Sequence, residues 1–254
     1  MPPVITDASR PLTFEVDAVN EHGEHVATPI AGENPLTLYV DKCEIVTLMT
    51  LGQAPEALAI GYLRNQRLVR SIDEIATVQV DWETDAVAIT THGGIDALEK
   101  KMEKRTVTTG CGQGTVFGDL MEEVDSIRLR NDVFLSEATL HTVLDAVRRH
   151  ETIYKSAGRH NAVDAIAGKM WLEGIDGSDK IFYTTGRLTS EMVIKAAQMG
   201  IPFLVSRSGL TRMGWEIAQR IGITMLGRAI NQRYLLFTGR QRFIAGASPA
   251  VDSQ

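Results

Sequence analysis

The alternation of strand and helix patterns in the second half of the chain constrains its fold most strongly. The expected strands and helices follow one another in the order 181–184, 190–199, 202–206, 213–221, 224–226 and 234–237. Strand–helix–strand repetition of this kind implies an α/β layer whose strands are at least partly parallel. Two more helices are expected before it. One follows the N-cap Ser136 and turns Leu140, Leu144 and other apolar residues to one face, and the other begins near Ala162.

The first third of the chain predicts mainly strands. Apolar and polar residues alternate with the strand period in four short runs, at 12–16, 36–40, 77–80 and 86–90. One helix interrupts them, because Pro55 suits a first helical position and Leu58, Tyr62 and Leu63 form an apolar stripe. Residues 92–120 contain six glycines and predict a linker and a mobile loop. We therefore expect a smaller β-rich N-terminal domain over residues 1–124, ending in this loop, and an α/β domain over 125–254.

Composition and charge exclude several classes of protein. No run of eighteen apolar residues occurs, and the N-terminus lacks a secretory signal, so we expect a cytoplasmic protein without a membrane segment. The net charge of -6 argues against general nucleic-acid binding, although it permits a local basic pocket. The chain has only two cysteines, Cys43 and Cys111, so we expect no disulfide framework. The His-x-Glu and Pro-Cys-x-x-Cys signatures of zinc deaminases are both absent, so we expect no metal site.

Three expected strand ends have similar compositions. Each supplies an arginine together with glycine or small hydroxyl residues, in the segments 184–187, 206–209 and 227–233. Ligands of open α/β sheets gather at the carboxyl ends of strands, and helix N-termini attract anions. These ends could therefore line a pocket for phosphates or a pyrophosphate, although no Gly-x-Gly-x-x-Gly or Walker pattern is present. The alternative is that they are solvated turns with ordinary helix caps.

The segment 159–164 allows two interpretations. His160 and Asp164 are four residues apart, so on a helix they share one face and could serve acid–base chemistry or ligand contact. The alternative is local, with Asn161 as the helix cap and Asp164 stabilising the first turn through the helix dipole. Spacing alone does not separate these two possibilities.

Cys111 is the strongest candidate for chemistry. Cys43 lies in a strand-like run and suits the usual role of a lone cysteine as a small buried apolar residue. Cys111 has glycine at 110, 112 and 114, which adds backbone freedom but no packing, so its segment should be exposed and mobile. Four basic residues between 100 and 105 could lower the pKa of its thiol, and the acidic residues Asp119, Glu122 and Glu123 oppose that shift. A nucleophilic thiol on a mobile loop could receive a sulfur atom as a persulfide and deliver it elsewhere.

Several segments resemble the FdhD family, the formate dehydrogenase accessory sulfurtransferases. The most specific is Gly158-Arg159-His160-Asn161-Ala162-Val163-Asp164. The other matching segments are 59–63, 109–112, 183–191, 200–202, 206–209 and 222–228, so the resemblance covers nearly the whole chain. It implies a cytidine-deaminase-like α/β/α C-terminal domain without zinc, and a homodimer. It also implies transfer of sulfur from a cysteine desulfurase to the Mo-bis(molybdopterin guanine dinucleotide) cofactor of formate dehydrogenase.

The resemblance also assigns roles to residues. Cys111 matches the persulfide cysteine of the family, and the segment 228–233 matches a stretch that contacts the cofactor. Together with the other strand ends and the 159–164 motif, the expected cofactor-binding residues are Arg228, Ala229, Ile230, Asn231, Gln232, Arg233, Thr185, Arg187, Ser206, Arg207, Ser208, His160 and Asn161.

The chain departs from the family pattern in two places. Gly114 stands where the family often has a second loop cysteine, so sulfur transfer would run through Cys111 alone. The chain also runs directly from Tyr154 to Arg159, where family members usually have a further segment with a Gly-x-x-His element. Two alternatives to the sulfur carrier follow. One is a chaperone that binds the cofactor without transferring sulfur. The other is a relative that is inactive because the segment before Arg159 is missing.

Overall fold

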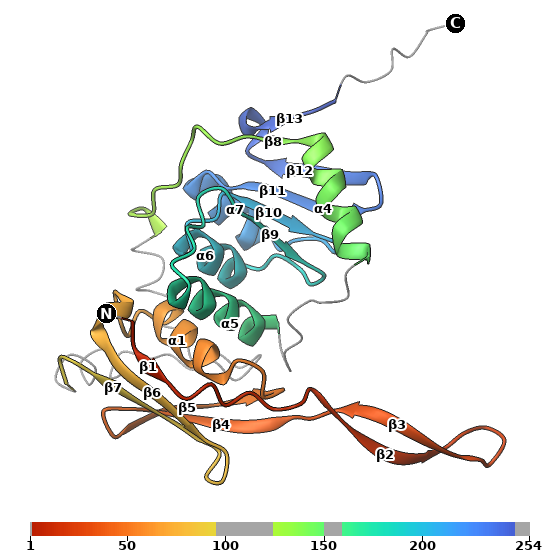
Figure 1. The fold of residues 1–254 in the computed structure, drawn as a ribbon. Coiled ribbons are helices and arrows are strands. Elements are labelled where there is room, and N and C mark those ends of the chain that lie inside the picture. Colours follow the sequence, from red (N-terminus) through yellow and green to blue (C-terminus); the bar gives the residue numbers. More distant parts are fainter. Residues whose placement is uncertain (1, 95–123, 150–158, 247–254) are drawn as a thin grey trace, which may run out of the picture. The chain divides into compact units, whose positions relative to one another are not determined.

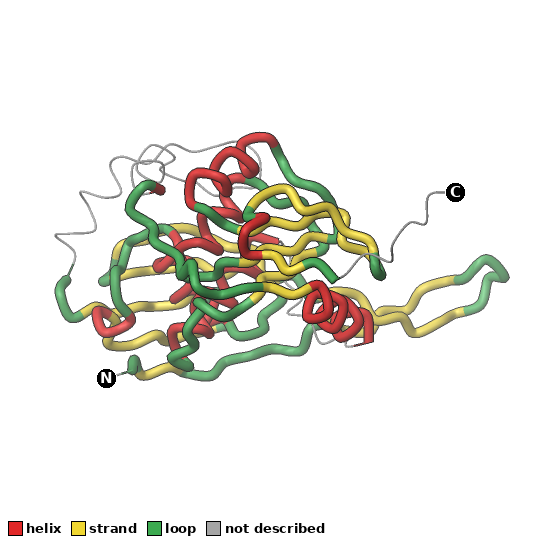
Figure 2. Tube along the Cα trace, turned by 90° about the horizontal axis from the view of Figure 1, so that it is seen from above, coloured by secondary structure: helices red, strands yellow, loops and turns green. Residues whose placement is uncertain are grey.

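The computed structural model describes residues 2–94, 124–149 and 159–246 in two compact units (Figures 1 and 2). The first unit contains residues 2–94 and 159–175 of this set, and the second contains 124–149 and 176–246. The loop with Cys111 lies outside the described residues. Mixed α/β architecture is confirmed, and the first unit is rich in strands as expected.

A five-stranded mixed sheet forms the base of the first unit. Its strand order is β1-β6-β7-β4-β5, with β1 parallel to β6, β4 parallel to β7 and the other neighbours antiparallel. The bounds are β1 Val4–Ile5, β4 Asn34–Val40, β5 Cys43–Thr50, β6 Ile75–Asp81 and β7 Ala86–Thr91, and the 3-10 helix η1 Ile72–Glu74 precedes β6. The strands predicted at 36–40, 77–80 and 86–90 are therefore confirmed as parts of β4, β6 and β7.

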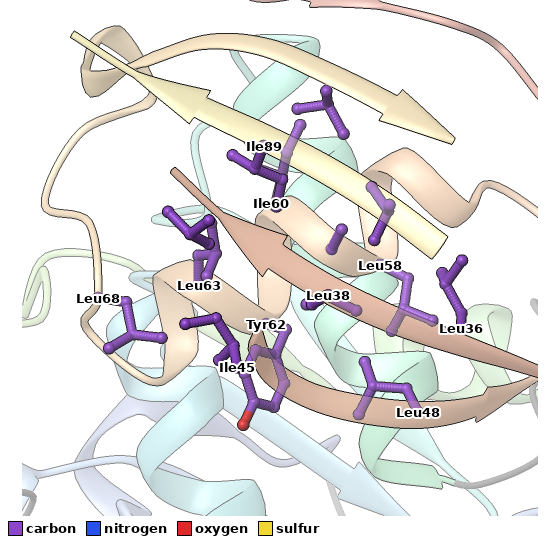
Figure 3. Close-up of a cluster of buried hydrophobic side chains, with 14 of the residues drawn as sticks. Leu36, Leu38, Ile45, Leu48, Leu58, Ile60, Tyr62, Leu63, Leu68 and Ile89 are labelled. Atoms are coloured by element: carbon purple, nitrogen blue, oxygen red, sulfur yellow. The ribbon is translucent and has the colours of Figure 1, made fainter. Parts of the chain in front are cut away.

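Helix α1 (Pro55–Asn65) is buried on nearly its whole circumference. One side packs on the sheet, where Leu58, Ile60 and Leu63 join the apolar side chains of β4, β6 and β7 in one core (Figure 3). The other side meets helix α5 (Arg159–Leu172). Glu56 is buried too, and its carboxylate accepts hydrogen bonds from the Thr6 hydroxyl at 2.8 Å and the Ala8 amide at 2.7 Å. A buried carboxylate with such partners is compatible with a stable core.

Two glycines allow helices α1 and α5 to touch backbone to backbone. A Cβ on Gly61 would lie 1.6 Å from the carbonyl oxygen of Asp164, and one on Gly168 would lie 1.8 Å from that of Ala57. The domain boundary predicted from the sequence assigned residues 159–172 to the domain over 125–254, but in the structure α5 packs in the first unit. The physical reason is that these glycines and the buried side of α1 offer α5 a complementary surface.

A hairpin outside the main sheet completes the first unit. Strands β2 (Thr13–Val19) and β3 (His25–Ala31) pair only with each other in the described part of the chain. Figure 1 shows this hairpin extending beyond β4 and β5. The strand predicted at 12–16 is confirmed within β2, although its alternation does not reflect a buried face, because most of its side chains are exposed.

The second unit contains the α/β layer predicted from the sequence. Its sheet has the order β12-β11-β10-β9, with β9, β10 and β11 parallel and β12 antiparallel to β11. The bounds are β9 Ile181–Thr184, β10 Phe203–Ser206, β11 Thr224–Ile230 and β12 Arg233–Thr238. Helices α6 (Ser190–Gln198) and α7 (Arg212–Ile221) connect the parallel strands.

Helices lie on both faces of this sheet. Helix α4 (Glu137–Arg149) packs Leu140 and Leu144 against Phe203 and Val205 of β10. Because side chains alternate along a strand, Leu204 and its neighbours in register, Phe182 and Met225, turn to the opposite face. Helix α7 packs beside β11 and β12. The predicted N-cap Ser136 is confirmed, since its hydroxyl accepts the Thr139 amide at 3.0 Å.

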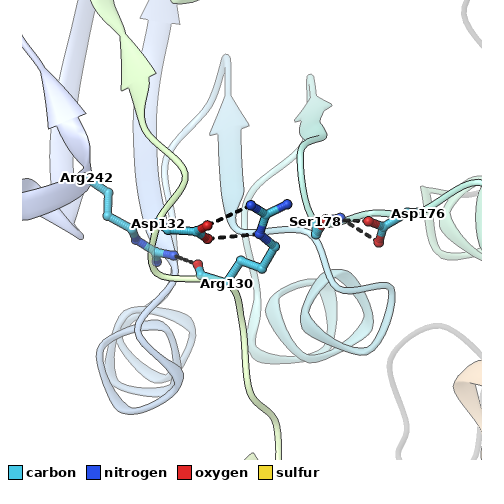
Figure 4. A network of polar contacts seen from close by, with 5 residues as sticks. All are labelled: Arg130, Asp132, Asp176, Ser178 and Arg242. Carbon is cyan, nitrogen blue, oxygen red and sulfur yellow. Dashed lines mark hydrogen bonds and ion pairs between the residues drawn. The ribbon is translucent and has the colours of Figure 1, made fainter.

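A short strand pair joins the residues just before α4 to those that follow η2. Strand β8 (Leu135–Ser136) pairs in parallel with β13 (Phe243–Ile244), which follows the 3-10 helix η2 (Arg240–Arg242). Arg242 is buried and donates from Nη1 to the Arg130 carbonyl at 2.9 Å, while the Arg130 side chain forms two hydrogen bonds with Asp132 (Figure 4). These contacts hold the segment before α4 against η2.

Among the described residues, none of the helices has both the length and the apolar character that a membrane crossing requires.

Candidate functional site

The carboxyl ends of the parallel strands β9 and β10 are followed by two interlocked loops. The loop at 184–187 and the loop at 206–209 are joined by backbone hydrogen bonds, from the Arg207 amide to the Thr184 carbonyl at 3.0 Å and from the Leu188 amide to the Gly209 carbonyl at 3.1 Å. Each loop then leads into a helix, α6 or α7. The geometry expected from the sequence, with several strand ends on one sheet edge, is therefore present.

The serine hydroxyls of the second loop fix this arrangement. Ser206 is fully buried; its Oγ donates to the Gly186 carbonyl at 2.7 Å and accepts from the Ser208 amide at 3.0 Å. The Ser208 hydroxyl donates to the Thr185 carbonyl at 2.7 Å. Because each hydroxyl proton is used within the protein and Ser206 is fully buried, only Ser208 of the two could contact a ligand, and only as a hydrogen-bond acceptor.

A pocket of ≈ 290 Å³ lies between helix α4 and the three parallel strand ends. Its lining residues come from α4, from the two loops and from the end of β11: Leu144, Asp145, Val147, Arg148, Tyr183, Thr185, Arg207, Ala229, Ile230 and Asn231. Apolar side chains thus stand beside one aromatic ring, two guanidinium groups and one carboxylate. Ligand sites commonly combine apolar walls with a few convergent polar groups, and the volume of this pocket lies at the lower end of the range of about 300–1,000 Å³ that small-molecule sites occupy.

The electrostatics of the pocket favour a ligand with an anionic part. Burial raises the pKa of the Tyr183 hydroxyl, and the nearby charge of Arg207 partly opposes this shift. Tyr183 therefore stays neutral and offers a flat ring and a hydrogen-bonding hydroxyl. Arg148 lies 3.6 Å from Asp145 on an exposed turn of α4, a weak ion pair that leaves the guanidinium available to a phosphate.

Five of the residues expected from the sequence to bind the cofactor line this pocket, namely Thr185, Arg207, Ala229, Ile230 and Asn231. Other expected cofactor-binding residues do not line it: Arg187, Ser206, Ser208, Arg228, Gln232 and Arg233.

The expected loop over 227–233 is wrong as a structural assignment. Strand β11 continues to Ile230 and β12 begins at Arg233, so this segment is the tip of a hairpin. Arg228 and Asn231 have positive φ values of 52° and 56°, and the register shifts between Gly227 and Ile230. The sequence gives no turn signal such as Asn-Gly here, which is why the tight hairpin was not predicted.

The 159–164 motif belongs to the first unit and is mostly buried. Asp164 is fully buried, and its Oδ1 accepts from Nδ2 of Asn65 at 2.6 Å. Asn161 donates from Nδ2 to the Met49 carbonyl at 2.7 Å. The proposed capping role of Asn161 is wrong, because α5 already includes Arg159. His160 shares α5 with Asp164, as its spacing predicts, and is also buried.

The residues of α4 were missed as site residues. Asp145, Val147 and Arg148 lie in the last turns of a helix whose sequence shows only an amphipathic pattern. Which helix covers a strand end depends on tertiary packing, so only the polar pair Asp145 and Arg148, three residues apart, could have drawn attention to this surface.

Cys43 agrees with its predicted role, since its thiol is free and it packs partly buried beside the first core. Within the described residues, no group of three or more histidine, cysteine or acidic side chains is arranged to hold a metal ion.

Comparison with known proteins identifies the family. The model of the FdhD/NarQ family matches residues 31–158 and 155–244, two stretches that meet where the sequence analysis finds a shortened segment. The sulfur carrier protein FdhD of Wolinella succinogenes is 27% identical over 230 residues, covering 81% of this chain and 79% of that protein. The protein of the same name from Geobacillus kaustophilus is 28% identical over 238 residues, covering 85% and 90%.

A solved structure shares the fold. The crystal structure of a protein from Desulfotalea psychrophila named as a formate dehydrogenase accessory protein has a TM-score of 0.68 to this chain. It is 21% identical and covers 92% of this chain and 100% of its own. The family match extends over more than half of the sequence and includes both units. The chain therefore belongs to the FdhD/NarQ family.

Proposed function

We propose that this protein is a sulfur carrier that transfers sulfur through a persulfide on Cys111 to the molybdenum cofactor of formate dehydrogenase. The observation that carries the proposal is the family match through the Cys111 segment, to relatives named sulfur carrier proteins. Cys111 is one of two cysteines, and the other, Cys43, packs beside a core. The thiol at 111 is therefore the candidate carrier.

The loading step needs no external oxidant. The Cys111 thiolate would attack the terminal sulfur of a persulfide on a cysteine desulfurase. A new sulfur–sulfur bond forms at Cys111 as the donor bond breaks, and the donor cysteine leaves as a thiolate. Since Gly114 occupies the place of a second loop cysteine, no disulfide within the loop competes with this step.

The pocket beside α4 is our proposed site for one nucleotide end of the Mo-bis(molybdopterin guanine dinucleotide), which is the cargo of the reaction. Arg207 and Arg148 would bind phosphate, and the Tyr183 ring would pack against a base. Asp145 is the carboxylate of the lining and could accept hydrogen bonds from the base. The volume of ≈ 290 Å³ suits one nucleotide rather than the whole cofactor.

We also propose that further residues expected from the family resemblance contact the cofactor outside this pocket. Arg187, Arg228, Gln232 and Arg233 would do so from the second unit, and His160 and Asn161 from the first unit. We also propose a homodimer, and a cytidine-deaminase-like arrangement for the second unit, which the parallel strands β9 to β11 and their flanking helices support.

The test is activation of formate dehydrogenase by Cys111→Ala, with Cys43→Ala as the matched control. We expect Cys111→Ala to abolish activation while thermal unfolding stays unchanged, and Cys43→Ala to retain activation. Full activation by Cys111→Ala would reject the carrier role.

The pocket also favours a second candidate, a chaperone that holds the cofactor without transferring sulfur. Binding of guanine nucleotides without a sulfur adduct on Cys111, after incubation with a desulfurase and cysteine, would support the chaperone. An inactive relative is the third possibility, and it predicts neither an adduct nor a shift of cooperative thermal unfolding by GDP.

A further inference from the structure

The β2–β3 hairpin forms an arm whose strands, within the described residues, pair only with each other. Its seven cross-strand pairs follow one unbroken antiparallel register. Asn20 closes the turn, since its side-chain oxygen accepts hydrogen bonds from the amides of His22 and Glu24, both at 3.0 Å. An isolated two-stranded hairpin is only marginally stable in water, so we expect the arm to gain stability from a surface on which it packs.

One face of the arm is uncharged and exposed. Directly opposite residues of an antiparallel pair share a face. This face therefore carries the pairs Phe14–Ile30, Val16–Thr28 and Ala18–Val26. The exposed fractions of its large side chains are 54% for Phe14, 42% for Ile30 and 44% for Val26. Clustered apolar exposure of this kind marks interaction surfaces more often than scattered apolar residues do.

The opposite face and the turn of the arm are acidic. Glu15 and Asp17 lie on that face, and Glu21 and Glu24 lie in the turn. Residues 11–40 contain five acidic side chains and no lysine or arginine. Because charges across an interface are complementary, a partner of the arm should be apolar where it meets the first face and basic around it.

The arm offers a partner its face rather than the edge of β3. The Gly32 amide donates to the Leu12 carbonyl at 2.9 Å, and hydrogen-bonded pairs alternate along the arm from there. Pro29 therefore stands at a position whose backbone nitrogen points outward, away from β2. Since proline has no N–H, it interrupts the row of donors that an added strand would need.

The arm belongs to the unit from which the chain continues to Cys111. Strand β7 is the last described strand before that segment and lies in the first unit, whereas every lining residue of the pocket beside α4 lies in the second. A protein bound at the arm thus uses residues separate from those proposed to bind the cofactor. This separation suits the sulfur donor, which must meet the thiol and not the cofactor.

Chain length permits Cys111 to reach a donor held on the arm. The Gly94 amide donates to the Thr91 hydroxyl, and the Thr91 amide donates to the carboxylate of Asp41, just beyond β4. The arm joins the other end of β4, and β4 and β2 have seven residues each, or about 24 Å each. Seventeen residues lead from Gly94 to Cys111, which gives the thiol a maximum reach of about 56 Å.

We propose that the β2–β3 arm is the docking element for the cysteine desulfurase that loads Cys111. The desulfurase surface that receives it is apolar with basic side chains around it. The inference rests on the proposed function and adds to it the surface that selects the donor. The arm itself takes no part in the transfer of sulfur.

The experiment measures the rate at which the full-length chain gains sulfur on its Cys111 peptide, at increasing excess of a desulfurase supplied with cysteine. Val26→Thr/Ile30→Thr places hydroxyls on the apolar face. The matched control is Val4→Thr/Ile5→Thr on strand β1, where these side chains are 69% and 40% exposed. We expect the half-saturating desulfurase concentration to rise at least about tenfold for the arm variant, with an unchanged limiting rate, and to stay unchanged for the control.

A second variant tests the charge of the arm. Glu15→Lys should raise the half-saturating concentration as well, whereas Glu83→Lys, the same exchange on the exposed turn between β6 and β7, should not. Sodium tetrasulfide separates docking from chemistry. The Cys111 thiolate attacks one of its sulfur atoms, a sulfur–sulfur bond of the reagent breaks, and trisulfide leaves as the dianion. The arm variants should gain this sulfur at the wild-type rate.

The possible failures are distinguishable. A wild-type chain that gains no sulfur from the desulfurase would reject the proposed function and the role of the arm with it. If the wild type gains sulfur, an unchanged half-saturating concentration in both arm variants, or slow loading of these variants by tetrasulfide, overturns the docking role alone. Arm variants that load normally but lose self-association or binding to formate dehydrogenase would assign the arm to those partners and overturn it too.

Discussion

Replacing Gly168 with alanine should separate helices α1 and α5 and destabilise the first unit strongly. The new Cβ would lie 1.8 Å from the carbonyl oxygen of Ala57, whereas ordinary contact begins at 3.4 Å. The two backbones must therefore move apart by about 1.6 Å. Because the obstacle is backbone and not a flexible side chain, we place the cost at the upper end of overpacking, about 3 kcal/mol. A loss of that size is a large fraction of a typical folding free energy.

The assay is urea unfolding followed by circular dichroism, with Gly93→Ala as the control. Gly93 has open space around its Cβ position, so its substitution should change stability by less than about 0.5 kcal/mol. Gly61→Ala meets the carbonyl of Asp164 across the same contact, so the double variant with Gly168→Ala should cost less than the two single effects combined. If Gly168→Ala is as stable as the control, the close helix contact is refuted.

Three further predictions concern single side chains. Arg207→Ala should weaken GDP binding, measured by calorimetry, at least about tenfold. Arg240→Ala removes an exposed cation outside the pocket lining and should leave GDP binding unchanged. Equal effects of the two variants would refute the proposed nucleotide site. Asp164→Ala should cost roughly 3 kcal/mol in urea unfolding, because it removes a buried hydrogen-bond acceptor of Asn65, and a loss below about 1 kcal/mol would contradict this. Burial and the Glu137 hydrogen bond raise the pKa of Tyr234 to about 12, so folding stability should decline as pH rises from about 10 towards 12. Tyr234→Phe should remove that part of the decline, and an unchanged pH profile would show that Tyr234 does not cause it.

The elements of the second unit were predictable from the sequence. Short β-type runs separated by helix-length stretches define β9 and β10 almost to the residue and the start of β11, and parallel order follows from the helices between them. The interlocked loops follow in turn, since parallel strands bring Thr185 and Arg207 to one edge.

Tertiary packing decided what the sequence could not. Helix α5 does not separate its apolar and polar residues onto opposite sides, so its sequence does not show that it belongs beside α1. The cover of the pocket by α4, and the tight hairpin at Asn231, likewise depend on contacts between segments far apart in the chain. The segment with Cys111 was assigned from glycine content and family resemblance, and its role stays a prediction.

The most direct test of the central claim is intact-mass and peptide mass spectrometry after incubation with a cysteine desulfurase and cysteine. We predict the gain of one sulfur atom on the peptide that contains Cys111, released by dithiothreitol and absent from Cys111→Ala. Cys43 should remain unmodified, since it packs beside the first core. A chain that gains no sulfur, or gains it only on Cys43, would contradict the sulfur-carrier account.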